Sequence, residues 1–355
     1  MSLQKKSRRV MEGVREAHDG MTAVPRKKFK KPNGYILDIE EIAQGVQSGS
    51  RLYLGKAITL LESSNPEHKK DGQELLNQLL PHTGNSLRLG ITGVPGAGKS
   101  TFIETFGEML TSLGHRVAVL AIDPSSSLTG GSILGDKTRM EELARNPKAF
   151  IRPSPTAGTL GGVHKKTRET MLLCEAAGYD IILVETVGVG QSETLVRSMV
   201  DMFMLLVLTG AGDELQGMKK GILELADAII VHKADGENAR LAKKTVSEYK
   251  QMMHFLQPAT ESWKTRSVAA SSIDNTGITE VWEMVQEFDE TVKESGYWKK
   301  RRQEQTKEWF RSMITDELHS RFFDDGNRRE VVGLLEKQVL SDKLTVAQAI
   351  VKLFE

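Results

Sequence analysis

The chain has little cysteine, little net charge and no long apolar run, and each shortage excludes a class of protein. Its single cysteine, Cys174, leaves no internal disulfide and no metal site built on paired cysteines, which fits a reducing cytosol. Lysine plus arginine number 48 and aspartate plus glutamate 47, so the net charge of +1 predicts no nucleic-acid or anionic-membrane partner. No apolar segment approaches the roughly twenty residues that span a bilayer. We therefore expect a cytoplasmic protein that binds neither membrane nor nucleic acid.

The first 35 residues differ in composition from the rest. Two basic runs, Lys5–Arg9 and Arg26–Lys31, enclose few apolar residues. Glu12, Glu16 and Asp19, together with the lack of an apolar stripe, argue against a transit peptide. We expect residues 1–35 to form a basic, disordered arm.

Hydrophobic periodicity divides the remainder into three regions. Residues 36–85 have helical spacing, and Asn65-Pro66 opens the last of the helices expected there. Residues 86–290 alternate short apolar runs with amphipathic helices, and residues 291–355 are helical and rich in charge. The expected strands are 87–91, 117–122, 181–184, 202–208, 228–231 and 266–270.

These strands are continuously apolar, whereas strands with one solvent-exposed face alternate apolar and polar residues. They should therefore be buried on both faces of a mostly parallel sheet. The sequence predicts an α/β fold in which helices flank a mostly parallel central sheet, with helical N- and C-terminal extensions. Ligands of such sheets bind at the carboxyl ends of the strands, and each motif described below falls at such an end.

The segment Gly93–Ser100 has the G-x-x-x-x-G-K-[ST] pattern of a phosphate-binding loop, between an expected strand and an expected helix. Glycines let backbone N–H groups turn toward a polyphosphate, and the helix presents its positive end to it. Lys99 would reach the β- and γ-phosphates, and the Ser100 hydroxyl would bind Mg²⁺. A glycine-rich turn that binds nothing is the alternative. The predicted nucleotide-binding residues here are Gly93, Val94, Pro95, Gly96, Ala97, Gly98, Lys99, Ser100 and Thr101.

A second motif places Glu185 at the end of a buried strand, three residues before Gly188. In a phosphate-loop protein, such a carboxylate holds Mg²⁺ or the attacking water, and the glycine N–H bonds the γ-phosphate. The alternative is an ordinary strand end with a charge and a turn. Many GTPases carry glutamine after this glycine, whereas Val189 stands here, so we expect slow intrinsic hydrolysis.

A third motif supplies two more carboxylates. Asp123 ends an expected strand, and Asp136 lies in a glycine-flanked loop, with Arg139 three residues later. Beside Mg²⁺ they would form a switch loop whose arginine faces phosphate charge. Asp136 could alternatively be only the N-cap of the next helix.

The fourth motif concerns the base. Asp235 of Lys233-Ala234-Asp235 would accept two hydrogen bonds from guanine, and the Lys233 stem would cover the ring. Adenine presents the wrong donors, so these residues favour GTP and GDP. His232 replaces the asparagine that many GTPases have here, while Ser271 and Ser272 could contact the guanine oxygen through their backbone.

Seven blocks of sequence together resemble one family. They are the Lys99 loop, Asp123–Ser126, Gly130–Met140, Arg152–Pro155, Gly158–Gly162, Glu185–Glu193 and Gly212–Gly217. From about Asp38 to the C-terminus the chain resembles the MeaB/ArgK-type GTPases, which are G-protein chaperones of methylmalonyl-CoA mutase.

The resemblance implies the fold of signal-recognition GTPases and MinD-like ATPases (the SIMIBI class), Mg²⁺-dependent GTP hydrolysis and a homodimer formed through helical C-terminal arms. It implies an adenosylcobalamin-dependent acyl-CoA mutase as partner, whose cofactor loading the chain would gate and which it would protect from inactivation. It also implies an additional switch around Gly210–Lys220 that communicates with the mutase. The implied catalytic residues are Lys99, Glu185, Arg139 and Lys219, and the implied metal ligands are Ser100, Asp123, Asp136 and Glu185.

Two other functions share the phosphate loop. One is a P-loop kinase linked to transport of lysine, arginine or ornithine. The guanine motif and the Glu185–Gly188 segment favour a GTPase over this kinase. The other is a nickel-insertion GTPase, which usually needs a histidine-rich tract or paired cysteines, and the eight histidines here are scattered.

Overall fold

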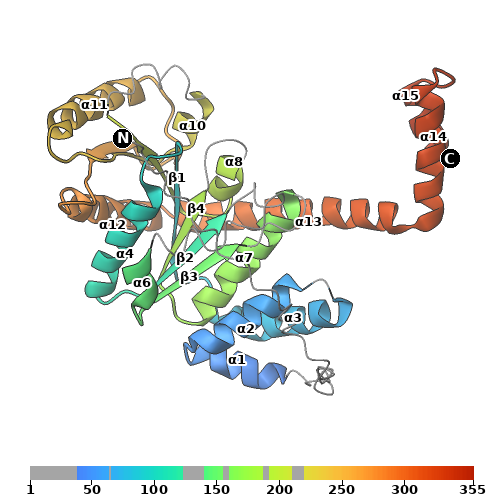
Figure 1. The fold of residues 1–355 in the computed structure, drawn as a ribbon, viewed down its shortest axis with the longest axis horizontal. Helices are drawn as coiled ribbons and strands as arrows, with labels where there is room; N and C mark the ends of the chain where they lie inside the picture. The colour runs from blue at the N-terminus through green and yellow to red at the C-terminus, as the bar shows by residue number, and fades with distance from the viewer. Residues whose placement is uncertain (1–37, 64, 123–139, 155–159, 187–191, 210–219) are drawn as a thin grey trace, which may run out of the picture. The chain divides into compact units, whose positions relative to one another are not determined.

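A seven-stranded parallel sheet forms the centre of the computed structural model, which describes residues 38–63, 65–122, 140–154, 160–186, 192–209 and 220–355 (Figure 1). Residues Ile39–Glu355 form one contact unit. The strand order is β3-β2-β4-β1-β5-β6-β7, and every pair of neighbours is parallel. The strands are β1 (Leu87–Gly93), β2 (Val117–Ile122), β3 (Ala149–Ser154), β4 (Ile181–Thr186), β5 (Met202–Val207), β6 (Ala228–Val231) and β7 (Arg266–Ala269).

The predicted α/β fold class is confirmed, and most strands lie within two residues of their expected bounds. Strands β2, β4, β5 and β6 are buried along their whole length, as continuous apolar runs require. The edge strand β3 was not predicted. Arg152 and Pro153 interrupt its apolar residues, so its sequence lacks the continuous apolar run of a buried strand. Proline within a strand is confined to sheet edges, and β3 lies at one.

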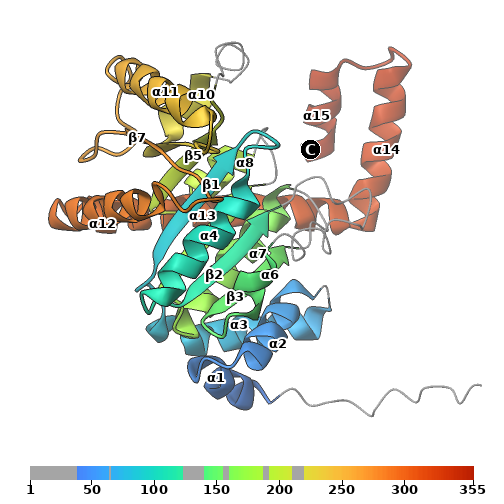
Figure 2. The ribbon, with the colours of Figure 1, turned by 60° about the vertical axis from the view of Figure 1, so that its left-hand side comes forward.

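Helices cover both faces of the sheet (Figures 1 and 2). Connections between parallel strands are right-handed, so the direction in which the chain moves along the sheet decides the face that each helix covers. One face packs on α4 (Lys99–Ser112), α6 (Glu141–Arg145) and α12 (Ile278–Glu294). The other carries α7 (Leu160–Ala176), α8 (Ser192–Arg197), α10 (Lys220–Leu225) and α11 (Asn238–Met253).

The N-terminal helices form an extension on α7. They are α1 (Ile39–Gln47), α2 (Arg51–Glu62) and α3 (Pro66–Leu79), followed by the short η1 (Leu80–His82). Asn65 caps α3 by accepting a hydrogen bond from the Glu67 N–H, and Pro66 occupies the first turn, as predicted. Lys166 of α7 donates to the Glu62 carbonyl at 2.9 Å, which fixes α2 to the sheet domain.

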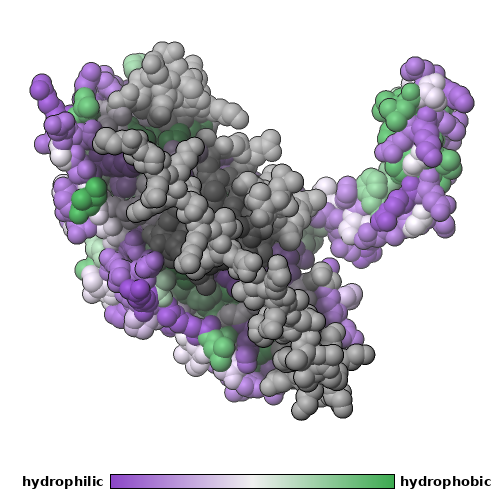
Figure 3. Space-filling model, viewed as in Figure 1, coloured by the Kyte–Doolittle hydropathy of each residue, from purple (hydrophilic) through white to green (hydrophobic). Residues whose placement is uncertain are grey.

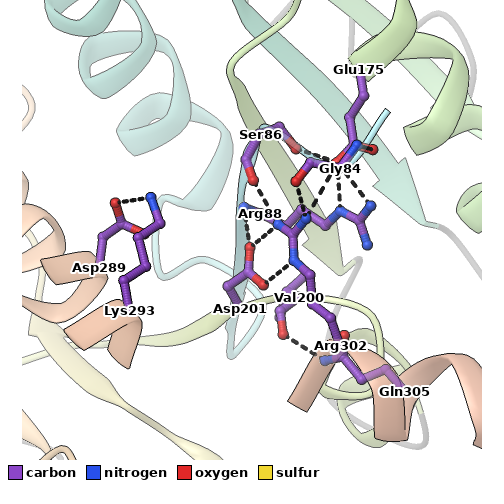
Figure 4. A network of polar contacts seen from close by, with 10 residues as sticks. All are labelled: Gly84, Ser86, Arg88, Glu175, Val200, Asp201, Asp289, Lys293, Arg302 and Gln305. Carbon is purple, nitrogen blue, oxygen red and sulfur yellow. Dashed lines mark hydrogen bonds and ion pairs between the residues drawn. The ribbon is translucent and has the colours of Figure 1, made fainter. Parts of the chain in front are cut away.

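The C-terminal helices are α13 (Tyr297–Asp324), α14 (Gly326–Leu340) and α15 (Val346–Phe354). Polar contacts attach the first part of α13 to the sheet domain (Figure 4). Arg302 donates to the carbonyls of Gly84 and Ser86 at 2.8 and 2.6 Å, and Gln305 donates to the Val200 carbonyl at 2.8 Å. Beyond this attachment α14 and α15 pack on each other (Figure 2). Across the described ranges, no helix combines the length and apolarity needed to cross a membrane.

Candidate nucleotide-binding site

The phosphate loop runs from the end of β1 to the start of α4, where sequence analysis predicted it. Two of its glycines have conformations that other residues rarely adopt, since φ is +83° at Gly96 and +88° at Gly98. At Gly93 a Cβ atom would lie 2.4 Å from the Leu206 carbonyl oxygen of β5. These glycines therefore allow the tight turn that brings the chain from the carboxyl end of β1 into the N-terminus of α4.

Lys99 is the first residue of α4 and is only 8% exposed. Its ammonium group donates to the carbonyls of Gly93 and Val94, at 2.8 and 3.3 Å. Burial lowers the pKa of Lys99, and the negative charge of Glu185 partly offsets this effect. A buried ammonium at the start of a helix, encircled by its own loop, is suited to an anionic phosphate.

Ser100 and Glu185 meet at the carboxyl end of the sheet. The Ser100 hydroxyl donates to Glu185 Oε1 at 3.2 Å, and Glu185 is 4% exposed. Glu185 is the fifth residue of β4, in register with Ile91 of β1 and Ala121 of β2. A hydroxyl and a carboxylate oxygen are hard donors of the kind that Mg²⁺ uses, so these two residues fit the metal.

A second contact at this edge was not predicted. Thr186 of β4 donates through its hydroxyl to the Thr92 hydroxyl of β1 at 2.8 Å, and both residues are fully buried. Thr92 directly precedes the phosphate loop, so the bond fixes the spacing between that loop and the Glu185 strand end. Thr186 lies within the Glu185–Gly188 motif, but the motif assigns it no role, and its separation of 94 positions from Thr92 conceals the pairing in the sequence.

The residues expected to bind the base follow β6 and β7. Ser271 donates to Asp235 Oδ1 at 3.0 Å, which orients the carboxylate that would accept from guanine. The backbone also joins these segments, because the Ala234 N–H donates to the Ala270 carbonyl at 3.1 Å. Lys233 adopts a left-handed backbone conformation with φ of +57°, which is rare outside glycine. Such strain at a strand end is typical of functional sites.

His232 contacts both halves of the site. Its Nδ1 lies 2.7 Å from the Ala97 carbonyl oxygen of the phosphate loop, and its Nε2 lies 2.8 Å from the Ser272 hydroxyl. The residue is 2% exposed, and burial lowers the pKa of the imidazole. In the sequence His232 was only a departure from the usual asparagine, and its contacts could not be inferred.

The structure thus brings together Lys99, Ser100 and Glu185 at the phosphate end, and Asp235, Ser271 and Ser272 at the base end. Five predicted site residues lie outside the described ranges: Asp123, Asp136, Arg139, Gly188 and Lys219.

Comparisons with known proteins agree with this architecture. The family model described as methylmalonyl Co-A mutase-associated GTPase MeaB matches residues 54–327. The GTPase ArgK of Escherichia coli (strain K12) is 45% identical over 314 residues, which cover 87% of this chain and 95% of that protein. The mitochondrial methylmalonic aciduria type A homolog of Mus musculus is 45% identical over 321 residues, covering 88% of this chain and 77% of that protein.

A solved structure is similar over nearly the whole chain. It is described as a LAO/AO transport system kinase, and it superposes with a TM-score of 0.72 at 37% identity, covering 89% of this chain and 96% of that one. The family model, the relatives and the phosphate loop with its buried lysine all lead to one assignment. This chain belongs to the MeaB family of P-loop GTPases.

Proposed function

We propose that this GTPase is a chaperone of an adenosylcobalamin-dependent acyl-CoA mutase, with methylmalonyl-CoA mutase as the first candidate. GTP hydrolysis would gate loading of the cofactor and protect the mutase from inactivation. The observation that carries this proposal is the family match over residues 54–327, because the family is described as associated with methylmalonyl-CoA mutase.

The phosphate end of the site would perform the hydrolysis. Lys99 neutralises charge on the β- and γ-phosphates, and its burial strengthens that interaction. Ser100 and Glu185 would hold Mg²⁺, which when bound offsets the negative charge of the triphosphate. Glu185 would also orient the attacking water, because its carboxylate lies at the end of β4 beside the phosphate loop.

The base end would select guanine. Asp235 accepts hydrogen bonds from the two guanine donors, and Ser271 holds the carboxylate in place. Ser271 and Ser272 supply backbone groups to the guanine oxygen, and the Lys233 stem covers the ring. GTP and GDP are therefore the nucleotides we expect the site to bind.

Other residues enter this proposal from sequence alone. We assign Asp123 and Asp136 to the metal, Gly188 to the γ-phosphate, and Arg139 and Lys219 to transition-state charge. Val189 in place of glutamine leaves the water without one of its usual partners, so turnover without a partner should be slow. If binding of the mutase changes the affinity for GTP, linkage requires that GTP change the affinity for the mutase by the same factor, typically worth about 1–3 kcal/mol.

The C-terminal helices are the proposed homodimer interface. Several large apolar side chains on this arm are exposed, among them Phe310, Leu318, Leu334, Ile350 and Phe354. Figure 3 shows hydrophobic surface, in green, on the C-terminal arm. An apolar cavity of about 440 Å³ lies between α14 and α15. Exposed apolar surface of this kind marks interfaces, and a second copy of the chain would cover it.

The test is GTP hydrolysis by the purified protein, alone and with an adenosylcobalamin-dependent mutase from the same source. We expect slow turnover alone, strong acceleration by the mutase, and a complex on gel filtration. Lys99→Ala protein serves as the control for contaminating GTPases. Unchanged hydrolysis and no complex with the mutase would refute the chaperone role and leave the GTPase assignment intact.

The same assay tests the kinase alternative, which the description of the 37%-identical solved structure keeps in view. A hydrolase releases one inorganic phosphate for each GTP consumed. A kinase with its acceptor present releases less, and the missing phosphate is found on lysine, arginine, ornithine or another acceptor. We expect full recovery of inorganic phosphate in the presence of each amino acid.

A further inference from the structure

His232 occupies a position between the two halves of the nucleotide site. It follows β6, and its backbone N–H donates to the Val207 carbonyl of β5 at 2.8 Å, so the sheet holds the main chain. Its ring makes a T-shaped contact with Phe102 on α4, with centroids 5.8 Å apart and planes at 81°. The ring therefore has a fixed orientation and points one nitrogen at each half of the site.

The hydrogen bonds determine where the proton of the ring lies. The Ala97 carbonyl oxygen is only an acceptor, so Nδ1 must carry hydrogen and donate to it. Because burial lowers the pKa of His232, the ring is neutral at pH 7 and Nε2 has a free lone pair. The Ser272 hydroxyl then donates to Nε2. One tautomer, with hydrogen on Nδ1, satisfies both contacts.

We infer that His232 is a positioning residue that holds the base-binding segment at a fixed distance from the phosphate loop, and thereby sets the affinity and selectivity for guanine nucleotides. The His232 brace, as we name it, consists of the bonds from Nδ1 to Ala97 and from Ser272 to Nε2. The inference rests on the proposed nucleotide site.

Each end of the brace leads directly to groups that would touch the nucleotide. Ala97 lies in the phosphate loop, and Gly98 after it packs so closely that a Cβ atom there would lie 2.7 Å from His232 Nδ1. At the other end, Ser272 adjoins Ser271, which donates to the Asp235 carboxylate. A shift of the imidazole would therefore move the phosphate loop and the guanine-reading carboxylate relative to each other.

Variants can separate the two bonds. His232→Asn replaces Nδ1–H with an amide N–H at a similar distance from the backbone, so it keeps the Ala97 bond and loses Ser272. Ser272→Ala removes the same second bond from the opposite side. His232→Ala removes both. His254→Asn is the matched control, since that histidine is exposed beyond the end of α11.

The measurements are dissociation constants for GDP and ADP, determined by competition with a fluorescent GDP analogue. We expect His232→Ala to raise the GDP constant by about tenfold or more and to reduce the preference for GDP over ADP. His232→Asn and Ser272→Ala should each have a smaller effect. The double variant that carries His232→Asn and Ser272→Ala should match the single ones, because both substitutions remove the same hydrogen bond. Wild-type GDP affinity and selectivity in every variant, or additive effects in the double variant, would overturn the inference.

Nitrogen NMR of ¹⁵N-histidine-labelled protein gives a second readout that needs no nucleotide. The signals absent from the His232→Asn spectrum identify His232, and they should show hydrogen on Nδ1 and an unprotonated Nε2 at pH 7. Hydrogen on Nε2 would contradict the brace. Failure of the wild type to bind GDP would refute the proposed site itself, a result that the NMR experiment distinguishes from an error about His232.

Discussion

Arg302 of α13 and Asp201, the residue before β5, form a buried two-pronged ion pair (Figure 4). Arg302 Nε donates to Asp201 Oδ1 at 2.9 Å, and Nη2 donates to Oδ2 at 2.6 Å. The Arg88 backbone N–H also donates to Oδ2, at 2.9 Å. Side-chain exposure is 13% for Arg302 and 2% for Asp201, so solvent screens this pair little. The pair attaches the C-terminal arm to the sheet domain.

Arg302→Ala should lower the free energy of unfolding by about 3–5 kcal/mol, because it removes the paired charge and both side-chain hydrogen bonds from the buried Asp201 carboxylate. Urea denaturation followed by circular dichroism measures this change. Lys293→Ala is the control, since its ion pair with Asp289 lies within one helix and the Lys293 side chain is 52% exposed. We expect that control to change stability by no more than about 0.5 kcal/mol. A loss below about 1 kcal/mol for Arg302→Ala would contradict the structural role of the pair.

The same pair predicts a dependence of stability on pH. Burial by itself would raise the pKa of Asp201, but the hydrogen bond and charge of Arg302 outweigh it and hold the pKa below its ordinary value. The stabilisation is therefore complete above the unfolded pKa of about 4 and is lost as pH falls through the lower folded value. The stability difference between wild type and Asp201→Asn should shrink in that acidic range. A difference that stays constant down to pH 2 would show that the charge of Asp201 contributes nothing.

Lys99→Ala should abolish GTP turnover, because it removes the cation that faces the phosphates. Lys99→Met should do the same while leaving the nucleotide-free protein at least as stable as wild type, since it keeps the side-chain volume and removes an ammonium whose pKa is lowered by burial. Steady-state phosphate release and thermal denaturation measure the two effects. Lys244→Ala on the exposed face of α11 is the control. Undiminished hydrolysis by either Lys99 variant would refute the phosphate-loop assignment.

Glu185→Gln should raise the half-saturating Mg²⁺ concentration and slow hydrolysis by about tenfold or more, since it removes the charge and keeps a group that accepts from Ser100. Loss of the carboxylate should also lower the pKa of Lys99 further. Hydrolysis measured across a Mg²⁺ titration checks the first effect. If the half-saturating Mg²⁺ concentration and the maximal rate both equal those of wild type, Glu185 does not act at the metal.

Ile350→Asp should convert the proposed dimer into a monomer. Ile350 lies on α15, lines the apolar cavity between α14 and α15, and is 51% exposed, so a charge there opposes burial by a second copy. Light scattering after gel filtration gives the mass. Lys337→Asp on the polar surface of α14 changes charge without touching the cavity and should stay dimeric. A wild-type protein that is monomeric at all concentrations would contradict the interface.

Local patterns in the sequence were sufficient for much of this protein. The phosphate loop, the Glu185 strand end and the buried strands are each encoded within about a dozen neighbouring residues, so they could be predicted. Strand β3 could not, because edge strands with Arg152 and Pro153 lack the apolar run used to find the others. Nor could the contacts of His232, whose partners Ala97 and Ser272 lie 135 and 40 residues away.

The basic run Lys299–Arg302 shows the same limit. In the sequence it is one charged stretch of a helix, and in the structure its four residues have different surroundings. Lys299 and Lys300 are exposed, whereas Arg301 is buried and donates to Thr260 at 3.0 Å. Which cations of a charged helix turn inward depends on the surface that the helix meets, and no local pattern records that surface.

Helix α13 is attached to the sheet domain near its N-terminal end, so a tilt of the helix displaces its far end more than its attached end. The contacts that attach it reach Trp309, whose ring centroid lies 5.6 Å from the Arg168 guanidinium carbon of α7, and the helix continues to Asp324. At 1.5 Å per residue the remaining length is about 22 Å, so a tilt of about 5° at the attached end moves the far end by roughly 2 Å. The attachment site includes Val200 and Asp201, which lie between α8 and β5. A displacement of that turn too small to disturb its hydrogen bonds is therefore enlarged where α14 begins.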